Sequence, residues 1–480
     1  MPDRIAILGA GPGGYIAAVR AAQLGADVTI IEEDNVGGTC LNWGCIPSKT
    51  LITTAELLQK IKKAESFGIS VDGSIRLNIQ RLMERKNAII QAQTKGILSL
   101  LQHHQIRYLK GTGYLKSKGL AAVRLSDGGE QDVTWDKLIL ATGTKPFNLP
   151  SLPFDGNRIL SSNDALCLGE VPESIVIVGG GVIGCEFAFL LSALGARVTI
   201  VEALSRMLPL PSVDEDCSKV LQREMKKRKI NFLVDKTVEG FDEVDGKLRV
   251  AIGPSPFLEN PTEKDKQLLF RDVDKLLVCI GRTPNTTNIE GFDSIGVQLS
   301  EKGWVKSNER METTVKDIYA IGDLLGPLKI MLAHVASTEG LVAAENAMGG
   351  KRIMDYNTVP GAIFTSPEVA NVGLTEAQAI DQGLKVRADS VNFRTLGKAQ
   401  AIGEIAGLAK IVSEIDTGKI LGVHIIGPHA TDLIAEGTLA IQMGANVQDL
   451  AATIHAHPTL AEVMMETSLK AMDRSLHGKP

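Results

Sequence analysis

Two glycine-rich turns in similar surroundings constrain the fold of this chain more than any other feature. The first turn spans Gly9 to Gly14 and the second spans Gly179 to Gly184, about 170 residues later. Each follows a short β-branched run and precedes a helical segment rich in small residues, and each unit then ends with a strand and a glutamate. This order is that of a βαβ unit. The two copies predict an internal duplication with two separate dinucleotide sites.

The glycines of both turns have the spacing that a dinucleotide pyrophosphate requires. The pattern GxGxxG is matched twice, by Gly9, Gly11 and Gly14 and by Gly179, Gly181 and Gly184. The first glycine of the pattern permits a tight turn, the second lets the backbone approach the pyrophosphate, and the third lets the helix pack on the strand. Glu32 and Glu202 each lie 18 residues beyond the last glycine, where a carboxylate accepts hydrogen bonds from ribose hydroxyls.

The second glutamate also bears on the choice of nucleotide. A carboxylate at Glu202 repels a 2′-phosphate, so NAD is favoured over NADP. Arg206 follows four residues later and is expected to be a solvated loop charge that leaves this preference intact.

Length and charge exclude several other classes of protein. A chain of 480 residues predicts two to four domains. Its formal net charge of −5 argues against a nucleic-acid partner or an anionic membrane surface. Residues 175–196 are mostly apolar, but they contain Glu186 and several glycines, so a strand, a turn and a buried helix explain them better than a membrane span. No targeting segment is expected before the first strand, and a cytoplasmic location is predicted.

Six cysteines are too few and too scattered for a disulfide framework, so a reducing compartment is the default. Four of them are isolated and are expected to be buried small hydrophobes: Cys167, Cys185, Cys217 and Cys279. No metal site is predicted.

Only Cys40 and Cys45 lie close together in the sequence. On a regular helix an offset of five residues places the Cα atoms roughly 8–9 Å apart, whereas a disulfide needs them within about 7 Å. A disulfide between them therefore requires a distorted turn, which Gly44 and Pro47 suit. The alternative is two unrelated buried cysteines, but the pair directly follows a dinucleotide site, which favours a redox role. Lys49 lies four residues after Cys45 and could stabilise a thiolate.

The segment Gly37–Lys49 resembles the active-site sequence of the FAD- and pyridine-nucleotide-dependent disulfide reductases, and the resemblance extends from Arg4 to about Leu476. It implies an α/β fold with two Rossmann-like dinucleotide-binding domains and a C-terminal α+β dimerisation domain. It also implies FAD and NAD as cofactors, and a homodimer. The implied boundaries are 1–149 for the FAD-binding domain, 150–282 for the NAD-binding domain, 283–350 for a central domain that completes the FAD site, and 351–480 for the interface domain.

The same resemblance implies roles for individual residues. Cys40 corresponds to the thiol that exchanges with substrate, and Cys45 to the thiol beside the flavin ring, which forms a charge-transfer contact when reduced. Glu186 is implied to pair with Lys49. The implied FAD contacts are Gly9, Gly11, Gly14, Glu32, Thr39, Lys49, Gly113, Thr142, Gly143, Asp323 and Ala333. The implied NAD contacts are Gly179, Gly181, Gly184, Glu202, Val238 and Gly281.

The C-terminal sequence His455–Glu462 contains a candidate base. Thiol exchange needs a group that takes up a proton, and histidine suits this with an ordinary pKa near 6.5. Pro458 is predicted to be the first residue of a helix, with His457 at its cap; a histidine in such a place is often only a cap. The family resemblance instead implies that His457 is the base, that Glu462 is its partner, and that the pair reaches the cysteines of the other subunit.

The wording of residues 41–49 resembles most closely the family members that oxidise dihydrolipoamide with NAD⁺. The implied partners are a lipoyl-bearing acyltransferase of a 2-oxo acid dehydrogenase complex or the H-protein of glycine cleavage. The alternatives are a glutathione- or mercuric-type reductase, or an FAD-binding protein without turnover. Two departures concern the flavin contacts: the segment from Asp323 to Met331 is about two residues longer than usual, and Val335 stands where a lysine is common.

Overall fold

The first structural unit is a seven-stranded sheet covered by helices. The computed structural model describes residues 2–126, 128–286, 289–327 and 329–477; Leu328, in the lengthened segment noted above, lies outside them. The strand order is β17-β6-β1-β2-β3-β4-β5. These strands are β1 (Arg4–Leu8), β2 (Asp27–Glu32), β3 (Arg107–Ser117), β4 (Leu120–Leu125), β5 (Glu130–Thr134), β6 (Lys137–Leu140) and β17 (Ile318–Ala320). The strands from β17 to β3 pair in parallel, and β4 and β5 extend the sheet in antiparallel fashion.

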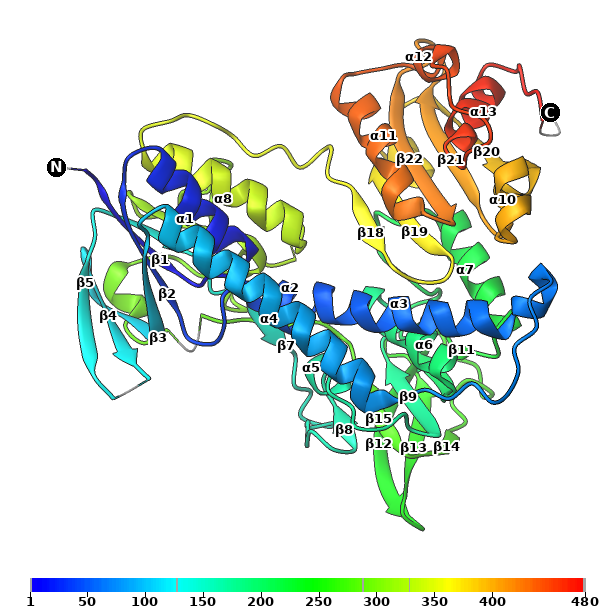
Figure 1. Ribbon diagram of the computed structural model, residues 1–480, viewed down its shortest axis with the longest axis horizontal. Coiled ribbons are helices and arrows are strands. Elements are labelled where there is room, and N and C mark those ends of the chain that lie inside the picture. Colours follow the sequence, from blue (N-terminus) through cyan, green and yellow to red (C-terminus); the bar gives the residue numbers. More distant parts are fainter. Residues whose placement is uncertain (1, 127, 287–288, 328, 478–480) are drawn as a thin grey trace.

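Two helices pack side by side on one face of this sheet (Figure 1). They are α1 (Pro12–Gln23) and α8 (Ala333–Ala347). Glycines allow the close approach, because a Cβ atom at Gly340 would lie 2.5 Å from the carbonyl oxygen of Gly13. The short helix α2 (Gly38–Trp43) follows β2, and the long helices α3 (Cys45–Lys62) and α4 (Ile79–His103) extend from the first unit to the second.

The second unit repeats the glycine turn on a five-stranded parallel sheet in the order β11-β10-β9-β15-β8. Its elements are β8 (Ile159–Leu160), α5 (Ser162–Ala165), β9 (Ser174–Val178), α6 (Val182–Leu194), β10 (Arg197–Val201), α7 (Glu215–Lys227), β11 (Asn231–Leu233) and β15 (Lys275–Val278). The apolar run at 175–196 thus forms β9, a turn and α6, as predicted. Among the described helices, none is long and apolar enough to cross a membrane.

Two small antiparallel sheets complete this part of the molecule. A hairpin sheet projects from the second unit and contains β12 (Lys236–Val244), β13 (Lys247–Pro254) and β14 (Leu269–Val273). The other sheet pairs β7 (Thr144–Pro146) with β16 (Arg282–Pro284). These two strands are the corresponding segments that follow each βαβ unit in the sequence, so the duplicated halves pair with each other beside the first sheet.

The third unit is a five-stranded antiparallel sheet in the order β18-β19-β22-β21-β20. Its elements are β18 (Gly361–Ile363), β19 (Glu368–Gly373), α9 (Glu376–Asp381), β20 (Val386–Asn392), α10 (Gly397–Ile402), β21 (Leu408–Glu414), β22 (Ile420–Gly427), α11 (Ala430–Gln442), α12 (Val447–Ala452) and α13 (Glu462–Ala471). An extended segment, 348–360, joins it to α8. The fold is therefore the α/β arrangement with a C-terminal α+β unit that the sequence predicted.

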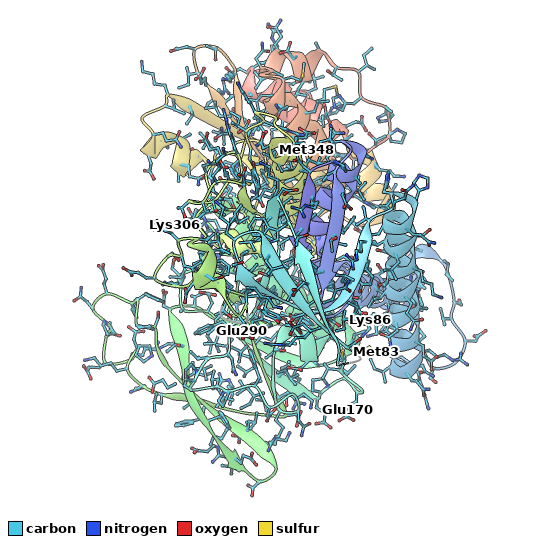
Figure 2. All side chains as sticks on the ribbon, turned by 90° about the vertical axis from the view of Figure 1, so that its left-hand side faces the viewer. Met83, Lys86, Glu170, Glu290, Lys306 and Met348 are labelled. Carbon is cyan, nitrogen blue, oxygen red and sulfur yellow. The ribbon has the colours of Figure 1, made fainter. Side chains whose placement is uncertain are left out.

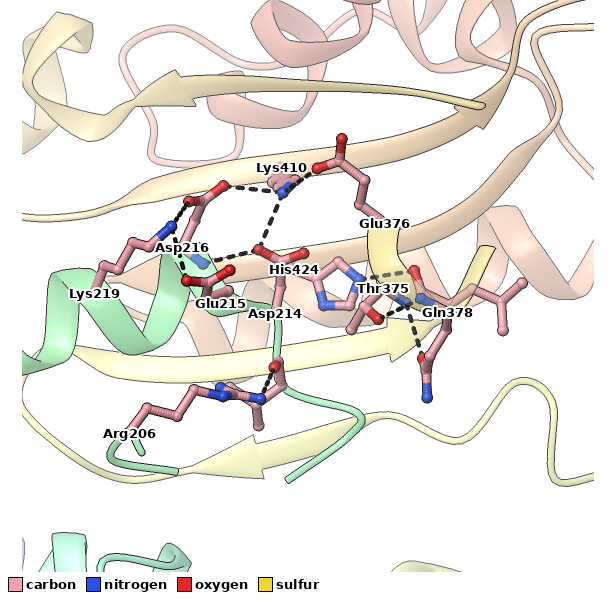
Figure 3. Close-up of polar contacts among 12 residues, drawn as sticks. Arg206, Asp214, Glu215, Asp216, Lys219, Thr375, Glu376, Gln378, Lys410 and His424 are labelled. Carbon is pink, nitrogen blue, oxygen red and sulfur yellow. Dashed lines mark hydrogen bonds and ion pairs between the residues drawn. The ribbon is translucent and has the colours of Figure 1, made fainter. Parts of the chain in front are cut away.

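A buried cation docks the third unit on the second (Figure 3). Lys410 of β21 pairs with Asp214 at 3.1 Å and Asp216 at 2.9 Å at the start of α7, and with Glu376 at 2.8 Å at the start of α9. Its side chain is only 7% exposed. His424 lies opposite Lys410 on β22 and is fully buried. Because a buried ammonium group requires paired carboxylates, this cluster fixes how α7 sits on the C-terminal sheet.

A second buried lysine ties α4 to the second unit. Lys86 donates from Nζ to the Leu166 carbonyl oxygen at 2.8 Å and lies 3.8 Å from the Cys167 sulfur; Figure 2 labels it next to Met83 on the same helix. Met83 packs against the apolar cluster of the second unit. Cys167 itself is exposed because it lies in the loop between α5 and β9, so the expectation that it is buried was wrong.

Candidate active site

One cavity of about 470 Å³ runs along the carboxyl ends of the parallel strands in the first sheet. Its size falls within the range of small-molecule sites. Its lining includes Glu32 and both Cys40 and Cys45. Nine residues implied as FAD contacts line it: Gly9, Gly11, Glu32, Thr39, Gly113, Thr142, Gly143, Asp323 and Ala333. Gly14 and Lys49 do not.

The first glycine turn is shaped for a pyrophosphate group. Gly9 has φ +100°, and a Cβ there would lie 2.3 Å from the carbonyl oxygen of Ala141. Gly14 closes the turn, since a Cβ there would lie 1.9 Å from the carbonyl oxygen of Gly9. Gly11 caps α1 without any side-chain hydrogen bond, so the N-terminus of a 12-residue helix opens toward the cavity. Such a helix end favours an anionic group.

The carboxylate of Glu32 also lines this cavity. Its Oε2 accepts the Ala10 N–H at 2.7 Å and its Oε1 accepts the Asp34 N–H at 2.9 Å. Burial raises the pKa of Glu32, although both N–H donors oppose the rise. Held by these bonds, the carboxylate keeps lone pairs for ribose hydroxyls. The glycine floor, the open helix end and this acid together fit the FAD that the sequence implies.

The cysteine pair lies at the junction of two helices that the sequence did not resolve. Cys40 belongs to α2, and Cys45 is the first residue of α3. Gly44 separates them with φ −153° and ψ −107°, which breaks the helix. The two cysteines therefore do not lie on one regular helix, which would hold their Cα atoms too far apart for a disulfide. In this structure both cysteines are free thiols, and the Cys40 thiol hydrogen-bonds to the Cys45 sulfur.

The two thiols have opposite acidities. The hydrogen bond from Cys40 and the nearby Lys49 ammonium lower the pKa of Cys45 to about 7, against the effects of burial and of Glu186. The same hydrogen bond, together with burial, raises the pKa of Cys40. Cys45 also stands at the N-terminus of an 18-residue helix, whose dipole favours a thiolate. The surroundings therefore favour the thiolate form at Cys45 and the thiol form at Cys40.

Lys49 and Glu186 form an ion pair beneath the cysteines. Lys49 Nζ lies 2.8 Å from Glu186 Oε2 and 3.0 Å from Oε1. Glu186 is on α6 of the second unit, so the pair crosses between the two dinucleotide-binding units. The backbone N–H of Phe364 donates to Glu186 at 3.0 Å, and Lys49 lies 4.2 Å from the Phe364 ring centroid. The pair therefore joins all three units next to Cys45.

Arg282 and Thr144 are site residues to which the sequence gave no role. Both line the cavity, from the paired strands β16 and β7. Arg282 donates from Nε to the Thr144 hydroxyl at 2.7 Å, and that hydroxyl donates to Asp323 at 3.1 Å. Burial lowers the pKa of Arg282, while Asp323 and Cys45 oppose this. Their contact joins segments 138 residues apart, so it depends on the fold.

The second glycine turn repeats the first in detail. Gly179 has φ +104°, and a Cβ at Gly184 would lie 1.9 Å from the carbonyl oxygen of Gly179. Gly181 caps the 13-residue helix α6 without a side-chain hydrogen bond. Glu202 accepts the N–H of Gly180 at 2.5 Å and that of Leu204 at 2.8 Å. The backbone positions for a second dinucleotide are thus the same as in the first unit.

Two further residues were implied as NAD contacts. Val238 is buried in β12, and Gly281 lies between β15 and β16 with φ +132° and open space at its Cβ position.

Arg206 is not the solvated charge that the sequence suggested. Its Nη2 donates to the carbonyl oxygens of Leu210 and Val213, both at 3.0 Å, and its Nη1 is buried. The guanidinium is held by the loop after Glu202 because that loop folds back onto the start of α7. These contacts commit Arg206 to the backbone, so the acid of Glu202 dominates the end of β10.

His457 and Glu462 form the hydrogen-bonded pair expected of a base and its partner. His457 Nδ1 lies 2.8 Å from Glu462 Oε1, and the other oxygen accepts the Thr459 N–H at 2.9 Å. Burial acts to raise the pKa of Glu462, but the hydrogen bonds to His457 and Thr459 lower it overall. The prediction that a helix begins at Pro458 was wrong: α13 begins at Glu462, because residues 457–461 form a turn closed by the Glu462 side chain.

The pair is separate from the cysteines of its own chain. His457 does not line the cavity that Cys40 and Cys45 line, and its side chain is 76% exposed. Among the described residues, no group of three or more His, Cys, Asp or Glu side chains is arranged to hold a metal ion. Two dinucleotide-binding units, a dithiol that lines the first cavity and an exposed histidine–glutamate pair define a dithiol oxidoreductase.

Comparison with known proteins identifies the family. Residues 3–340 match the model for pyridine nucleotide-disulphide oxidoreductases, and residues 359–468 match the dimerisation domain of the same family. The chain therefore belongs to the pyridine nucleotide-disulphide oxidoreductase family. It is an FAD- and NAD-dependent oxidoreductase, and its C-terminal unit is a dimerisation domain.

Similar proteins span the whole chain. A dihydrolipoyl dehydrogenase of Chlamydia trachomatis is 40% identical over 476 residues, which is 99% of this chain and 98% of the relative. One of Bacillus subtilis is 39% identical over 482 residues and 98% of each chain. The crystal structure of LpdA from Mycobacterium tuberculosis superposes with a TM-score of 0.88 at 28% identity, covering 98% of this chain and 99% of that one.

Proposed function

We propose that the chain is a dihydrolipoyl dehydrogenase, which oxidises protein-bound dihydrolipoamide to lipoamide with NAD⁺. The observation that carries this proposal is the Cys40–Cys45 dithiol that lines the dinucleotide cavity, with the pKa of Cys45 lowered to about 7. The similar proteins of C. trachomatis and B. subtilis are named dihydrolipoyl dehydrogenase, and the alignment covers 98% of each of them. FAD held by this cavity would supply the two-electron acceptor between the dithiol and NAD⁺.

The two cysteines divide the exchange between them. In the oxidised form a substrate thiolate attacks the disulfide at Cys40, and Cys45 leaves as the thiolate. The low pKa of Cys45 makes it the better leaving group of the pair. Lys49 supports that thiolate, and Glu186 holds Lys49 in place through its two short contacts. The second substrate thiolate then attacks the substrate sulfur that is bonded to Cys40, so that Cys40 leaves as a thiolate and the substrate is released as a cyclic disulfide.

Proton transfer is assigned to His457 with Glu462. Each substrate thiol must lose a proton before it attacks, and an imidazole held at Nδ1 by a carboxylate presents its free Nε2 as the acceptor. In its own chain this imidazole is exposed and lies outside the cysteine cavity. A second copy of the chain, joined through the dimerisation domain, supplies it to the Cys40–Cys45 pair. The enzyme is thus a homodimer with two composite sites.

The remaining residues bind the two nucleotides. Gly9, Gly11 and Glu32 bind the pyrophosphate and ribose of FAD. Asp323, which accepts the Thr144 hydroxyl, binds FAD elsewhere in the same cavity. Gly179, Gly181 and Glu202 hold NAD⁺ in the second unit. The domain boundaries at 149/150, 282/283 and 350/351 remain part of this proposal. So do a cytoplasmic location and a lipoyl-bearing acyltransferase or H-protein as the partner.

A steady-state assay with dihydrolipoamide tests the function directly. NADH formation is expected with NAD⁺ and is expected to be much slower with NADP⁺. Cys45→Ser should lower kcat by about 10³-fold or more, whereas the matched control Cys167→Ser, at an exposed loop position, should leave it unchanged. Reduction of glutathione disulfide with NADPH, without dihydrolipoamide oxidation, would contradict the proposal in favour of the glutathione-type alternative.

A further inference from the structure

Helix α8 carries a buried carboxylate that the mechanism above does not use. Glu339 is 1% exposed. Its Oε2 accepts the backbone N–H of Gly322 at 2.6 Å, and its Oε1 accepts the hydroxyl of Tyr356 at 2.6 Å. Both oxygens are therefore committed to neutral donors from two other segments of the chain.

One of these donors belongs to the wall of the cofactor cavity. Gly322 and Asp323 both line it, and so do Met331, Leu332 and Ala333 at the start of α8. Gly322 has φ +71° and no side chain. Glu339 does not line the cavity, so its bond to the Gly322 N–H holds the turn from outside the cavity. The next residue, Asp323, accepts the Thr144 hydroxyl at 3.1 Å from within the cavity wall.

The other donor comes from the segment that leads to the dimerisation domain. Tyr356 lies in the extended stretch between α8 and β18. Lys329 lies 4.5 Å from the centroid of the Tyr356 ring. A line of hydrogen bonds thus runs from this segment through Tyr356 and Glu339 to the backbone of the cavity wall.

A buried carboxylate in this position is energetically costly. Burial raises the pKa of Glu339 to about 7, although the Tyr356 hydroxyl and the Gly322 N–H oppose the rise. Two charged groups also face it: Asp323 raises this pKa and Lys329 lowers it. A leucine would fill such a site without the desolvation penalty. What the carboxylate adds is a fixed acceptor for the Gly322 N–H.

We propose that Glu339 is a positioning residue for bound FAD: it fixes the Gly322–Asp323 turn against the cofactor, and Tyr356 holds its carboxylate in place. The inference rests on FAD occupying the cavity, as in the proposed function. Glu339 contacts the turn and not the cavity, so it acts through Gly322 and Asp323.

The test is FAD affinity, measured from the fluorescence of released flavin in serial dilutions of the full-length holoenzyme. Glu339→Ala removes the acceptor that holds the Gly322 N–H and the Tyr356 hydroxyl, so the dissociation constant of FAD should rise about 10–100-fold. Tyr356→Phe should raise it about 3–10-fold. Glu339→Gln keeps an acceptor for Gly322 and should restore affinity to within about threefold. Glu345→Gln is the matched control on α8, where Glu345 pairs with Arg20 and Arg352.

The pH dependence separates positioning from simple packing. Burial raises the pKa of Glu339 to about 7, so the carboxylate that accepts the Gly322 N–H takes up a proton as pH falls through this range. Protonation weakens this acceptor, so a positioning role predicts that FAD affinity falls as pH drops below this range. Glu339→Gln should lose this component of the pH profile, whereas Glu345→Gln should keep it.

The outcomes distinguish this inference from the proposed function. If the wild-type chain binds no FAD, the proposed function fails with it. If the wild-type chain binds FAD, and if the variants Tyr356→Phe and Glu339→Ala bind it as tightly as the wild type does, only the positioning role is overturned. Should Glu339→Ala fail to fold, Tyr356→Phe and the pH profile of Glu339→Gln decide. The proposal is overturned if Tyr356→Phe has the FAD affinity of the wild type and Glu339→Gln keeps the wild-type pH profile of FAD binding.

Discussion

Replacing Lys49 with methionine should raise the pKa of the Cys45 thiol. The Lys49 ammonium is one of the groups that lower this pKa, from 9.0 to about 7. Methionine keeps much of the length and apolar stem of lysine and removes the charge. It also leaves Glu186 without its cation at 2.8 Å, and this carboxylate already opposes the thiolate. Both changes act in the same direction.

The size of the effect follows from the pKa. One pKa unit corresponds to about 1.4 kcal/mol, so the surroundings of Cys45 stabilise its thiolate by about 3 kcal/mol relative to an ordinary thiol. About half of Cys45 is then thiolate at pH 7. An opposite charge at such a distance contributes about one pKa unit or more. In Lys49→Met the thiolate fraction at pH 7 should fall to about a tenth, while the Cys40 hydrogen bond remains.

Alkylation of the reduced enzyme measures this fraction. The rate of iodoacetamide labelling, resolved between Cys40 and Cys45 by tandem mass spectrometry, should follow the thiolate of each cysteine. Cys45 should react about fivefold more slowly at pH 7 in Lys49→Met and at the wild-type rate well above pH 9. Glu186→Gln is the sign control, because removing the carboxylate should lower the pKa of Cys45 and speed labelling below pH 7.

Two results would refute this reasoning. A wild-type Cys45 that titrates at about 8.5 or higher would show that its surroundings do not favour the thiolate. Shifts of the same sign in Lys49→Met and Glu186→Gln would show that the effect arises from disturbed packing and not from charge.

Three other changes test separate parts of the structure. Glu462→Gln should lower kcat about 10–100-fold with unchanged FAD content, because His457 loses its carboxylate; an unchanged kcat in stopped-flow assays would exclude the pair. Glu202→Gln should raise KM for NAD⁺ about tenfold or more, since an amide cannot accept both backbone N–H groups; an equal KM would contradict this. Lys410→Met should lower the free energy of unfolding in urea by about 3–5 kcal/mol, because three carboxylates lose their cation. Lys219→Met, at an exposed lysine, should lower it by less than about 0.5 kcal/mol. Equal losses in the two variants would contradict this role of Lys410.

Much of the fold could be predicted because each signal is local. The glycine spacing of both turns fixes a strand, a tight turn and a helix, and Glu32 and Glu202 then lie where the next strand ends. The structure shows the same backbone bonds to Ala10 and Gly180 at both places. The two similar sequence units therefore form equivalent hydrogen bonds in the structure.

Other features depend on contacts between distant segments. The pairing of β7 with β16 joins Thr144 to Arg282 across 138 residues, and no local pattern marks either residue as part of the site. The start of α13 was misplaced because Pro458 suggests a helix start, while the Glu462 side chain instead closes a turn onto Thr459. Arg206 was misjudged for the same reason, since its partners come from a loop that folds back.

The pairing of the two cysteines could be argued only in part from sequence. A disulfide at their spacing would require a distorted turn, which Gly44 and Pro47 suit, but the spacing alone left two unrelated cysteines as an alternative. The acidity of Cys45 depends on Lys49, on the Cys40 thiol and on a glutamate 137 residues away from that lysine. This arrangement needs all three units in place.

The most direct test of the central claim is an anaerobic thiol count with the purified holoenzyme. One equivalent of dihydrolipoamide should convert the Cys40–Cys45 disulfide to two alkylatable thiols, and NAD⁺ should then restore the disulfide with one NADH formed per pair. Thiols that do not appear, or NADH formed at the wild-type rate by Cys40→Ser or Cys45→Ser, would show that electrons reach NAD⁺ by a route that does not use this dithiol.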